Sequence, residues 1–252
     1  MNFRKIVFNF ITALLIISVS IYARQAESIM NNDNSFLEVK DVDIEQGLLI
    51  YREILNSADA GVLPFRIGWG VMNNMEVGVK FPYVFIENGD NDFGDISIYQ
   101  KFKFIEENDK IPVVCGGLEF NLPTGNIKGF NEYSNSKLDF KLFATLGKKV
   151  AQQMNIFGGL SLNFIGAGDA TEFGYNSGLN YKISERLKLV GELYGKKISS
   201  ESKVNVISQS YISPGIIFNN AGNSVGVKFA VPFGLNNKSA DHIINISIEH
   251  TF

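Results

Sequence analysis

The 252-residue chain is poor in the residues that build disulfide scaffolds and metal sites. It contains one cysteine, two histidines and six prolines. A single cysteine excludes an intramolecular disulfide, and two histidines exclude a multi-histidine metal site. The net charge of −3 gives no basic surface of the kind that nucleic-acid binding requires. After about residue 23, no apolar run reaches the ~18 residues that a membrane-spanning helix needs, which disfavours a helical membrane protein.

Motifs for catalysis or cofactor binding are also scarce. Ser239, Asp241 and His242 lie close together in the sequence, but no serine occupies a nucleophile elbow, so a polar loop is expected there. The sequence at 166–169 lacks GxGxxG spacing and a following helix, which indicates a hairpin turn. Cys115 lies on an expected strand and reads as a packing residue. We therefore predict no enzyme activity, catalytic residue, metal or cofactor.

The N-terminus has the pattern of a secretory signal peptide. In residues 1–23, Arg4 and Lys5 precede an apolar stretch, and Ile21-Tyr22-Ala23 offers a cleavage site with a small residue at its end. A retained amphipathic helix or membrane anchor is the alternative. Residues 24–40 are polar and lack periodicity, which predicts a loosely ordered periplasmic lead-in. The remaining residues, 41–252, carry a different pattern.

From about residue 42 onward, apolar and polar residues alternate with the period of two that is typical of β-strands. The clearest pair of segments is 63–71 and 77–85, which the turn Asn73-Asn74 joins as a hairpin. Continued along the chain, the same pattern predicts about twelve strands of ~10 residues, and no helix is needed.

The connections between these expected strands alternate in length. Those after even-numbered strands are short, such as Asn73-Asn74, and those after odd-numbered strands tend to be longer, such as 124–135. Transmembrane β-barrels have short periplasmic turns, longer outer loops and an even number of strands. The sequence therefore predicts an all-β fold, a single antiparallel transmembrane β-barrel at 41–252, exported to the outer membrane. Alternation alone does not exclude a soluble sandwich or lipocalin-like barrel.

Charged residues occupy the strand faces opposite the apolar ones, where a barrel has its lumen. The candidate pore-lining residues nearest mid-depth are Arg66, Lys80, Lys101, Glu119, Lys141, Glu192 and Lys228. Five cations against two carboxylates give a local charge of +3, which predicts a hydrated lumen with a weak anion preference. The alternative is that these groups pair with one another and close the interior.

Two segments depart from a regular barrel pattern. The longest outer loop, 124–135, either folds inward and narrows the pore or stays exposed and mobile, and the sequence favours the exposed loop. Pro214 falls inside an expected strand, where its missing N–H costs a ladder hydrogen bond unless a bulge absorbs it. We therefore expect a kink or a shifted register at Pro214.

The last expected strand ends on an aromatic residue. Ile244, Ile246 and Ile248 alternate behind Phe252, while His250 is an unusual residue in that register. A terminal aromatic residue after alternating apolar residues resembles the signal by which outer-membrane barrels are recognised for assembly. We therefore expect Phe252 to be an assembly signal, with the barrel-assembly machinery and outer-membrane lipid as partners.

Several short motifs together resemble one family of outer-membrane barrels. They are VGVKFPYVF at 77–85, Gly94-Asp95, Leu-Pro-Thr-Gly at 122–125 and Pro214-Gly215. The chain resembles, over most of 42–252, the family described as putative MetA-pathway of phenol degradation. This resemblance implies an outer-membrane transporter, and the family name implies import of aromatic compounds. We therefore predict a porin-like channel for passive or facilitated passage of a small solute, aromatic or anionic in character. The alternative is a plugged structural or surface-interaction barrel that acts through its outer loops.

Overall fold

The computed structural model describes the expected barrel region and little of the chain before it. The described residues are 37, 39–52, 59–87, 91–127, 133, 137–166, 169–200, 207–220 and 225–252. The predicted signal peptide and most of the predicted lead-in therefore lie outside the described residues. Within the described part, no helix is long and apolar enough to cross a membrane.

The described residues form fourteen β-strands. Twelve are long enough to build a wall, and two, β4 and β13, are short. In chain order they are β1 (Val42–Arg52), β2 (Ala60–Met72), β3 (Met75–Ile86), β4 (Asn91–Phe93), β5 (Ile96–Ile105), β6 (Val113–Leu122), β7 (Asp139–Ala151), β8 (Met154–Ile165), β9 (Ala170–Ser184), β10 (Leu187–Ser200), β11 (Ile207–Asn219), β12 (Val225–Ala230), β13 (Phe233–Gly234) and β14 (His242–Thr251).

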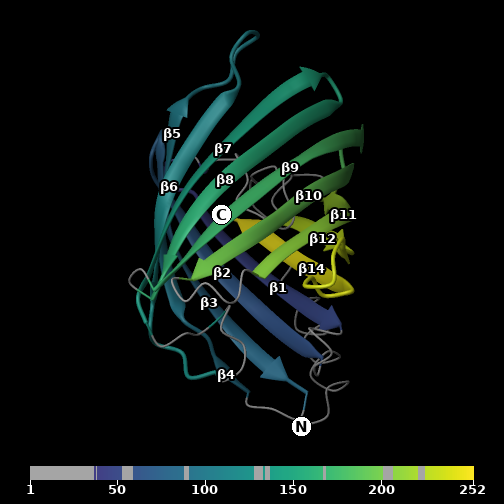
Figure 1. The fold of residues 1–252 in the computed structure, drawn as a ribbon. Coiled ribbons are helices and arrows are strands. Elements are labelled where there is room, and N and C mark those ends of the chain that lie inside the picture. The colour runs from purple at the N-terminus through teal and green to yellow at the C-terminus, as the bar shows by residue number, and fades with distance from the viewer. Residues whose placement is uncertain are drawn as a thin grey trace.

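The strands close into one antiparallel barrel (Figure 1). Each long strand pairs with the next along the chain, and β14 pairs with β1 over ten residues, from Asp43 opposite Thr251 to Arg52 opposite His242. The short strand β4 pairs with β3 beyond the start of β5, and β13 lies between β11 and β14 beyond the end of β12. The wall therefore has twelve antiparallel positions, as the sequence predicted.

The two ends of the barrel carry different connections. One end has the two-residue turns 73–74, 152–153 and 185–186, and we call it the inner end because it is expected to face the periplasm. The other, the outer end, carries the long connections 123–138 and 235–241. The predicted division into short turns and longer loops is confirmed, although the outer connection 166–169 is itself short.

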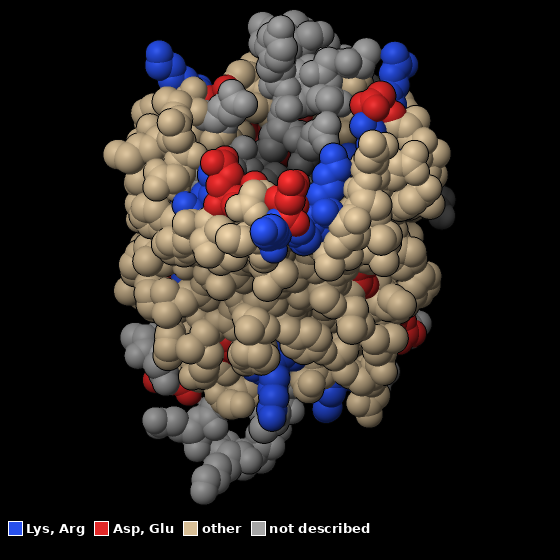
Figure 2. All heavy atoms as spheres, turned by 90° about the horizontal axis from the view of Figure 1, so that it is seen from above, with Lys and Arg blue, Asp and Glu red and all other residues tan. Residues whose placement is uncertain are grey.

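Apolar side chains face outward and charged side chains face inward along the strands. Phe104 on the outer surface is 67% exposed, whereas Glu192 on the opposite face of the wall is 2% exposed. In the view of Figure 2, Lys, Arg, Asp and Glu side chains gather in one cluster in the upper half, and the broad area below this cluster is formed mostly by other residues. An apolar belt around a closed wall suits hydrocarbon, because the pairing of β14 with β1 leaves the described sheet without two open edge strands.

Pro214 lies in β11 without a bulge. Register is the same on both sides of it, since Ile212 faces Phe233 and Gly215 faces Ala230. Instead, the partner strand is interrupted between β12 and β13, where Val231 still donates to the Pro214 carbonyl at 3.1 Å and Pro232 has no N–H to donate. The expected shift in register is therefore wrong. The neighbouring strand is interrupted opposite Pro214, and Pro232 lies one residue beyond Val231, where its carbonyl accepts from the Ile243 N–H of β14 at 2.9 Å.

Candidate functional site

The barrel interior holds all seven residues that the sequence placed in the lumen. Lys101, Glu119, Glu192 and Lys228 are buried, and Arg66, Lys80 and Lys141 are partly buried. They come from β2, β3, β5, β6, β7, β10 and β12, so the ring of charge spans most of the wall. Alternation along each strand is sufficient to place them, because successive side chains point to opposite faces.

A network of ion pairs ties together the strands at the two ends of the chain. Arg66 on β2 lies 2.6 Å from Asp43, 3.1 Å from Glu45 and 3.7 Å from Glu249. Lys228 on β12 lies 2.9 Å from Glu45 and 2.8 Å from Glu249. Since Asp43 and Glu45 belong to β1 and Glu249 to β14, these contacts bridge the seam where the barrel closes.

A second set of contacts crosses β3, β5 and β6. Lys80 donates to Glu119 at 2.6 Å, and Lys101 lies 3.9 Å from Glu76. The Tyr99 hydroxyl donates to the other oxygen of Glu76 at 3.0 Å. Most of the interior cations are thus held against carboxylates rather than left free to attract ions.

The positive excess predicted from the sequence is absent from the folded interior. Five further inward carboxylates, Asp43, Glu45, Glu76, Glu172 and Glu249, stand against two further inward cations, Lys188 and Lys196, so the predicted excess of three positive charges is cancelled among these described groups. The number of inward carboxylates predicted from the sequence was too low because the prediction covered only the charged residues near the middle of each strand. Continuing the alternation of β1 toward its start would have found Asp43 and Glu45.

Removing Arg66 is expected to weaken the closing seam. In Arg66→Ala, Asp43 loses its ion pair at 2.6 Å, and Glu45 and Glu249 each lose one of the two cations that they contact. We expect a loss of about 3 kcal/mol in the free energy of unfolding, because breaking a buried pair leaves uncompensated charge. Urea titration of the detergent-refolded barrel measures this change in the free energy of unfolding. Lys137→Ala, which removes an exposed pair with Asp169, is the control and should change stability by less than about 0.5 kcal/mol.

The inner mouth is narrowed by a residue that precedes β1. Leu37 is 2% exposed, and its backbone N–H donates to Glu76 at 3.4 Å. Its side chain packs over Gly68, where an added Cβ would lie 3.2 Å from Leu37 Cδ1 and 2.8 Å from the Tyr99 hydroxyl. Leu37 therefore lies in the lumen among inward-facing residues. This position could not be predicted from the sequence, because a lone leucine in a polar segment has no periodicity.

The outer mouth is narrowed by the connection between β6 and β7. Asp95 accepts a hydrogen bond from the Gly125 N–H at 2.8 Å, and its own N–H donates to the Tyr133 carbonyl at 2.6 Å. The Thr124 hydroxyl accepts from the Ile96 N–H at 2.9 Å. These bonds join Gly94-Asp95 to the Leu-Pro-Thr-Gly segment, so both motifs serve to fold one connection back onto the barrel.

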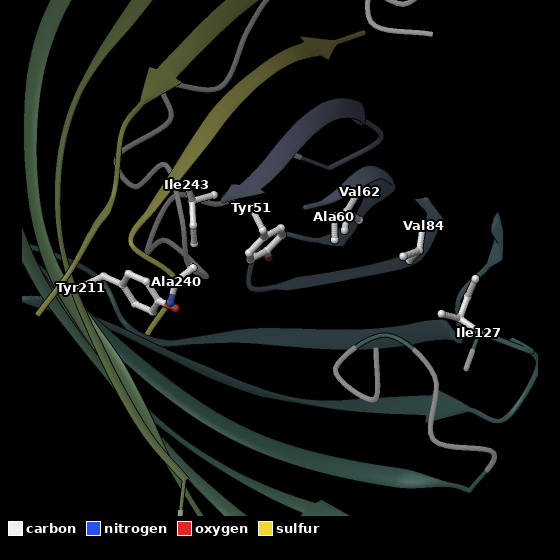
Figure 3. Packing of buried hydrophobic residues seen from close by; sticks show 8 residues of the cluster. All are labelled: Tyr51, Ala60, Val62, Val84, Ile127, Tyr211, Ala240 and Ile243. Atoms are coloured by element: carbon white, nitrogen blue, oxygen red, sulfur yellow. Dashed lines mark hydrogen bonds between the residues drawn. The ribbon is translucent and has the colours of Figure 1, made fainter. Parts of the chain in front are cut away.

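Two residues of this connection reach the interior. Ile127 is 4% exposed and belongs to a buried cluster with Tyr51, Val62 and Val84, and the Tyr133 hydroxyl lies 2.9 Å from that of Tyr51. Figure 3 shows the Ile127 side chain at one end of this cluster and Tyr211, Ala240 and Ile243 at the other. The expectation of an exposed loop is therefore wrong for these two residues.

Space remains between the two narrowed mouths. A cavity of about 250 Å³ lies in the outer half of the lumen, lined by residues of β1, β7, β8, β9, β10, β11 and β14 and by Tyr133. Among the described residues, no group of three or more His, Cys, Asp or Glu side chains is placed to hold a metal ion.

The sequence profile of the family described as "Putative MetA-pathway of phenol degradation" matches residues 31–250. The chain belongs to this family. This confirms the resemblance carried by the short motifs. In this member of the phenol-degradation MetA family, two of those motifs, Gly94-Asp95 and Leu-Pro-Thr-Gly, are joined by the hydrogen bonds that fold the outer connection inward.

Solved structures share the barrel architecture. The COG4313 outer membrane channel from Pseudomonas putida F1 is 12% identical, matches 89% of this chain and 100% of its own, and has a TM-score of 0.70. A KdgM porin is 7% identical over 84% of this chain and 99% of its own, with a TM-score of 0.56. A NanC porin is 10% identical over 83% of this chain and 98% of its own, with a TM-score of 0.57. No curated protein sequence matches the chain. The fold of this family member is thus that of outer-membrane β-barrels.

Proposed function

We propose that the protein is an outer-membrane channel for passive or facilitated passage of a small solute, exported by a signal peptide at 1–23. The observation that carries this proposal is the unfilled 250 Å³ cavity inside a closed, apolar-belted wall. The seven inward charges, from Arg66 to Lys228, line the path in this proposal, and their pairing favours weak ion selectivity over a strong anion preference. Structures with the same fold are described as channels and porins, which supports the assignment.

A plugged barrel that acts through its outer loops is the second candidate. It is favoured by the two narrowed mouths, because Leu37 fills part of the inner end and Ile127 with Tyr133 fills part of the outer end. The two candidates differ in one measurable property, which is whether small solutes cross the folded barrel.

Swelling of proteoliposomes distinguishes the two candidates. The mature chain is refolded in detergent, checked for the change in gel mobility on heating that folded barrels show, and reconstituted into vesicles. We expect vesicles in isosmotic glycine or arabinose to swell faster than protein-free vesicles, and vesicles in a trisaccharide to swell no faster, because both mouths are narrow. Swelling at the protein-free rate in glycine would contradict the channel and leave the plugged barrel.

We also propose that Phe252 directs assembly of the barrel. Its backbone pairs with Val42 across the closing seam, at 2.8 and 3.1 Å, while its side chain remains about half exposed on the outer surface. We expect Phe252→Ser to reduce the amount of barrel in the outer membrane of cells and to leave refolding in detergent unchanged. Phe233→Ser, at an equally exposed aromatic residue of the outer end, is the control. Equal losses in cells for both variants would argue against a special role for Phe252.

A further inference from the structure

The cavity in the outer half of the lumen, which we call the outer chamber, is lined by aromatic and hydrogen-bonding side chains that are interspersed with one another. The hydrogen-bonding side chains come from every strand between β7 and β11 and include Thr145, Ser161, Glu172, Asn176, Lys196 and Gln209. The aromatic side chains come from β1, β7, β10 and β11 and include Tyr51, Phe143, Tyr194 and Tyr211. A solute held in this chamber would therefore lie against rings and exchange hydrogen bonds around its edge.

Two inward glycines let polar groups approach the wall of the chamber closely. An added Cβ at Gly159 on β8 would lie 2.6 Å from Oδ1 of Asn176 and 3.1 Å from Cγ2 of Thr145. An added Cβ at Gly174 on β9 would meet the hydroxyl oxygen of Ser161. Because neither glycine has a side chain, the Asn176 amide and the Ser161 hydroxyl lie over the backbone at these positions and are not pushed toward the centre of the chamber.

These polar groups have hydrogen-bonding capacity that the protein itself does not use. Thr145 is 6% exposed, and its Oγ1 is buried and has no hydrogen-bond partner among the described residues. Within the described part of the chain, the side chains of Ser161 and Asn176 make no hydrogen bond either. A hydroxyl or an amide can both donate and accept. Hydroxyl groups on a solute would therefore satisfy all three side chains, and a buried polar group gains free energy when it finds a partner.

The charged residues at the chamber supply both signs. Glu172 lies 3.6 Å from Lys196, and Lys141 lies opposite Glu119 in the β6–β7 pair. A carboxylate only accepts hydrogen bonds and an ammonium group only donates them. Two neighbouring hydroxyl groups can therefore donate to Glu172 and accept from Lys196 at the same time. A neutral solute with several hydroxyl groups uses both charges of the pair without separating them.

The tyrosines of the chamber are held in place by contacts of their own. The rings of Tyr194 and Tyr211 stack with centroids 5.1 Å apart and planes 19° apart. The Tyr211 hydroxyl accepts a hydrogen bond from the Ala240 N–H at 3.0 Å, and Figure 3 shows the Tyr211 ring directed toward Ala240. The faces of a sugar ring carry apolar C–H groups, which pack against aromatic rings. Because the tyrosines are already ordered, such packing does not carry the entropy cost of fixing them.

We propose that the outer chamber binds one neutral sugar ring, a monosaccharide, as the solute of the channel. One face of the sugar packs against Tyr194. Its hydroxyl groups form hydrogen bonds with Thr145, Asn176 and the pair of Glu172 and Lys196. Size supports one ring, since a cavity of ~150 Å³ accommodates benzene, and the chamber, at about 250 Å³, exceeds that volume but is less than twice as large.

This solute differs from the aromatic compound that the family description implies. An aromatic ring with few polar atoms would leave most of the hydrogen-bonding side chains of the chamber without partners, which costs free energy. The assignment rests on the proposed channel function, because it names the class of solute that crosses.

Calorimetric titration of the detergent-refolded mature chain tests the assignment, with the heat of titration into detergent alone subtracted. The probes are the neutral sugars D-glucose and D-galactose, D-glucuronate, which carries a carboxylate on the same kind of ring, and phenol, which is an aromatic ring with a single hydroxyl. We expect the better of the two neutral sugars to bind at least about tenfold more tightly than phenol, because phenol leaves hydrogen-bonding groups of the chamber unpaired. We also expect it to bind at least as tightly as D-glucuronate.

A pair of asparagine variants locates the binding. In Asn176→Ala, the affinity for that neutral sugar is expected to fall about tenfold, because the variant lacks an amide that can donate and accept. Asn155→Ala is the matched control and should retain full affinity. Asn155 lies on β8 near the inner end, opposite Asn180, and does not line the chamber.

Absence of binding by both neutral sugars would overturn the assignment. So would tighter binding of phenol or D-glucuronate, or a loss of affinity in Asn176→Ala no larger than in Asn155→Ala. If Asn176→Ala does not refold, the comparison of the probes in the unaltered protein still decides. Swelling measurements keep this test separate from that of the channel. A barrel that passes glycine but binds neither sugar refutes the solute alone, whereas one that binds a sugar but passes nothing refutes the channel alone.

Discussion

Replacing Asp95 with alanine is expected to raise the single-channel conductance by about twofold or more, because it releases a constriction at the outer mouth. Asp95 accepts the hydrogen bond from Gly125 that turns the β6–β7 connection back toward the lumen. The alanine variant loses that acceptor, so the connection that carries Ile127 is held by fewer hydrogen bonds, although those from Ile96 to Thr124 and from the residue 95 N–H to Tyr133 remain. Planar-bilayer recording of the refolded variant measures the change, which should be accompanied by larger current fluctuations.

Asp92→Ala is the matched control for this variant. Asp92 lies three residues earlier on β4, is exposed, and accepts a hydrogen bond from the neighbouring Phe93 N–H at 2.8 Å. Its removal takes away one carboxylate near the same mouth without touching the connection. A conductance rise of the same size in both variants would assign the effect to charge at the entrance and not to a released constriction.

Introducing a charge at the inner mouth is expected to have an effect of similar size. In Leu37→Asp, the new carboxylate lies against Glu76, whose carboxylate already accepts a hydrogen bond from the backbone N–H of residue 37. Repulsion between two buried carboxylates should expel residue 37 from its position over Gly68 and widen the mouth. We expect the single-channel conductance to rise by about twofold, measured in symmetrical 1 M KCl to suppress the contribution of the added charge.

Val39→Asp provides the comparison for the inner mouth. Val39 is exposed at the turn that leads into β1. The substitution Val39→Asp therefore adds the same charge as Leu37→Asp at the same end of the barrel. We expect its conductance to equal that of the unaltered protein. If Leu37→Asp refolds and conducts no better than Val39→Asp, Leu37 does not limit the path at the inner end.

Much of the barrel wall could be predicted from the sequence, because the alternation of apolar and polar residues within each strand shows which face of that strand points toward lipid. The pattern of alternate apolar residues in 63–71 and 77–85 fixes both the hairpin and the side that faces lipid, since a shift of one residue reverses every side chain. Arg66, Lys80 and Lys141 follow from the same rule. The even strand count and the two classes of connection then imply closure.

The mouths and the charge balance could not be predicted in this way, because they depend on residues far apart in the sequence. The bond from Gly125 to Asp95 spans thirty residues, and that from Thr251 to Asp43 spans 208. Gly94-Asp95 contributes to the family resemblance in the sequence, but its structural role could not be predicted without the position of Gly125. Pro214 could be recognised as a misfit, whereas its accommodation depends on the gap between β12 and β13 in the neighbouring strand.

Single-channel recording of the unaltered mature chain in a planar bilayer tests the central claim most directly. The chain is refolded in detergent, and its heat-dependent gel mobility confirms the folded barrel before it is added to the bilayer. We predict discrete, reproducible conductance steps of small size, since the interior holds open space between two narrowed mouths. A folded barrel that gives no steps at any applied voltage would contradict the channel and show that Leu37, Ile127 and the paired charges close the interior.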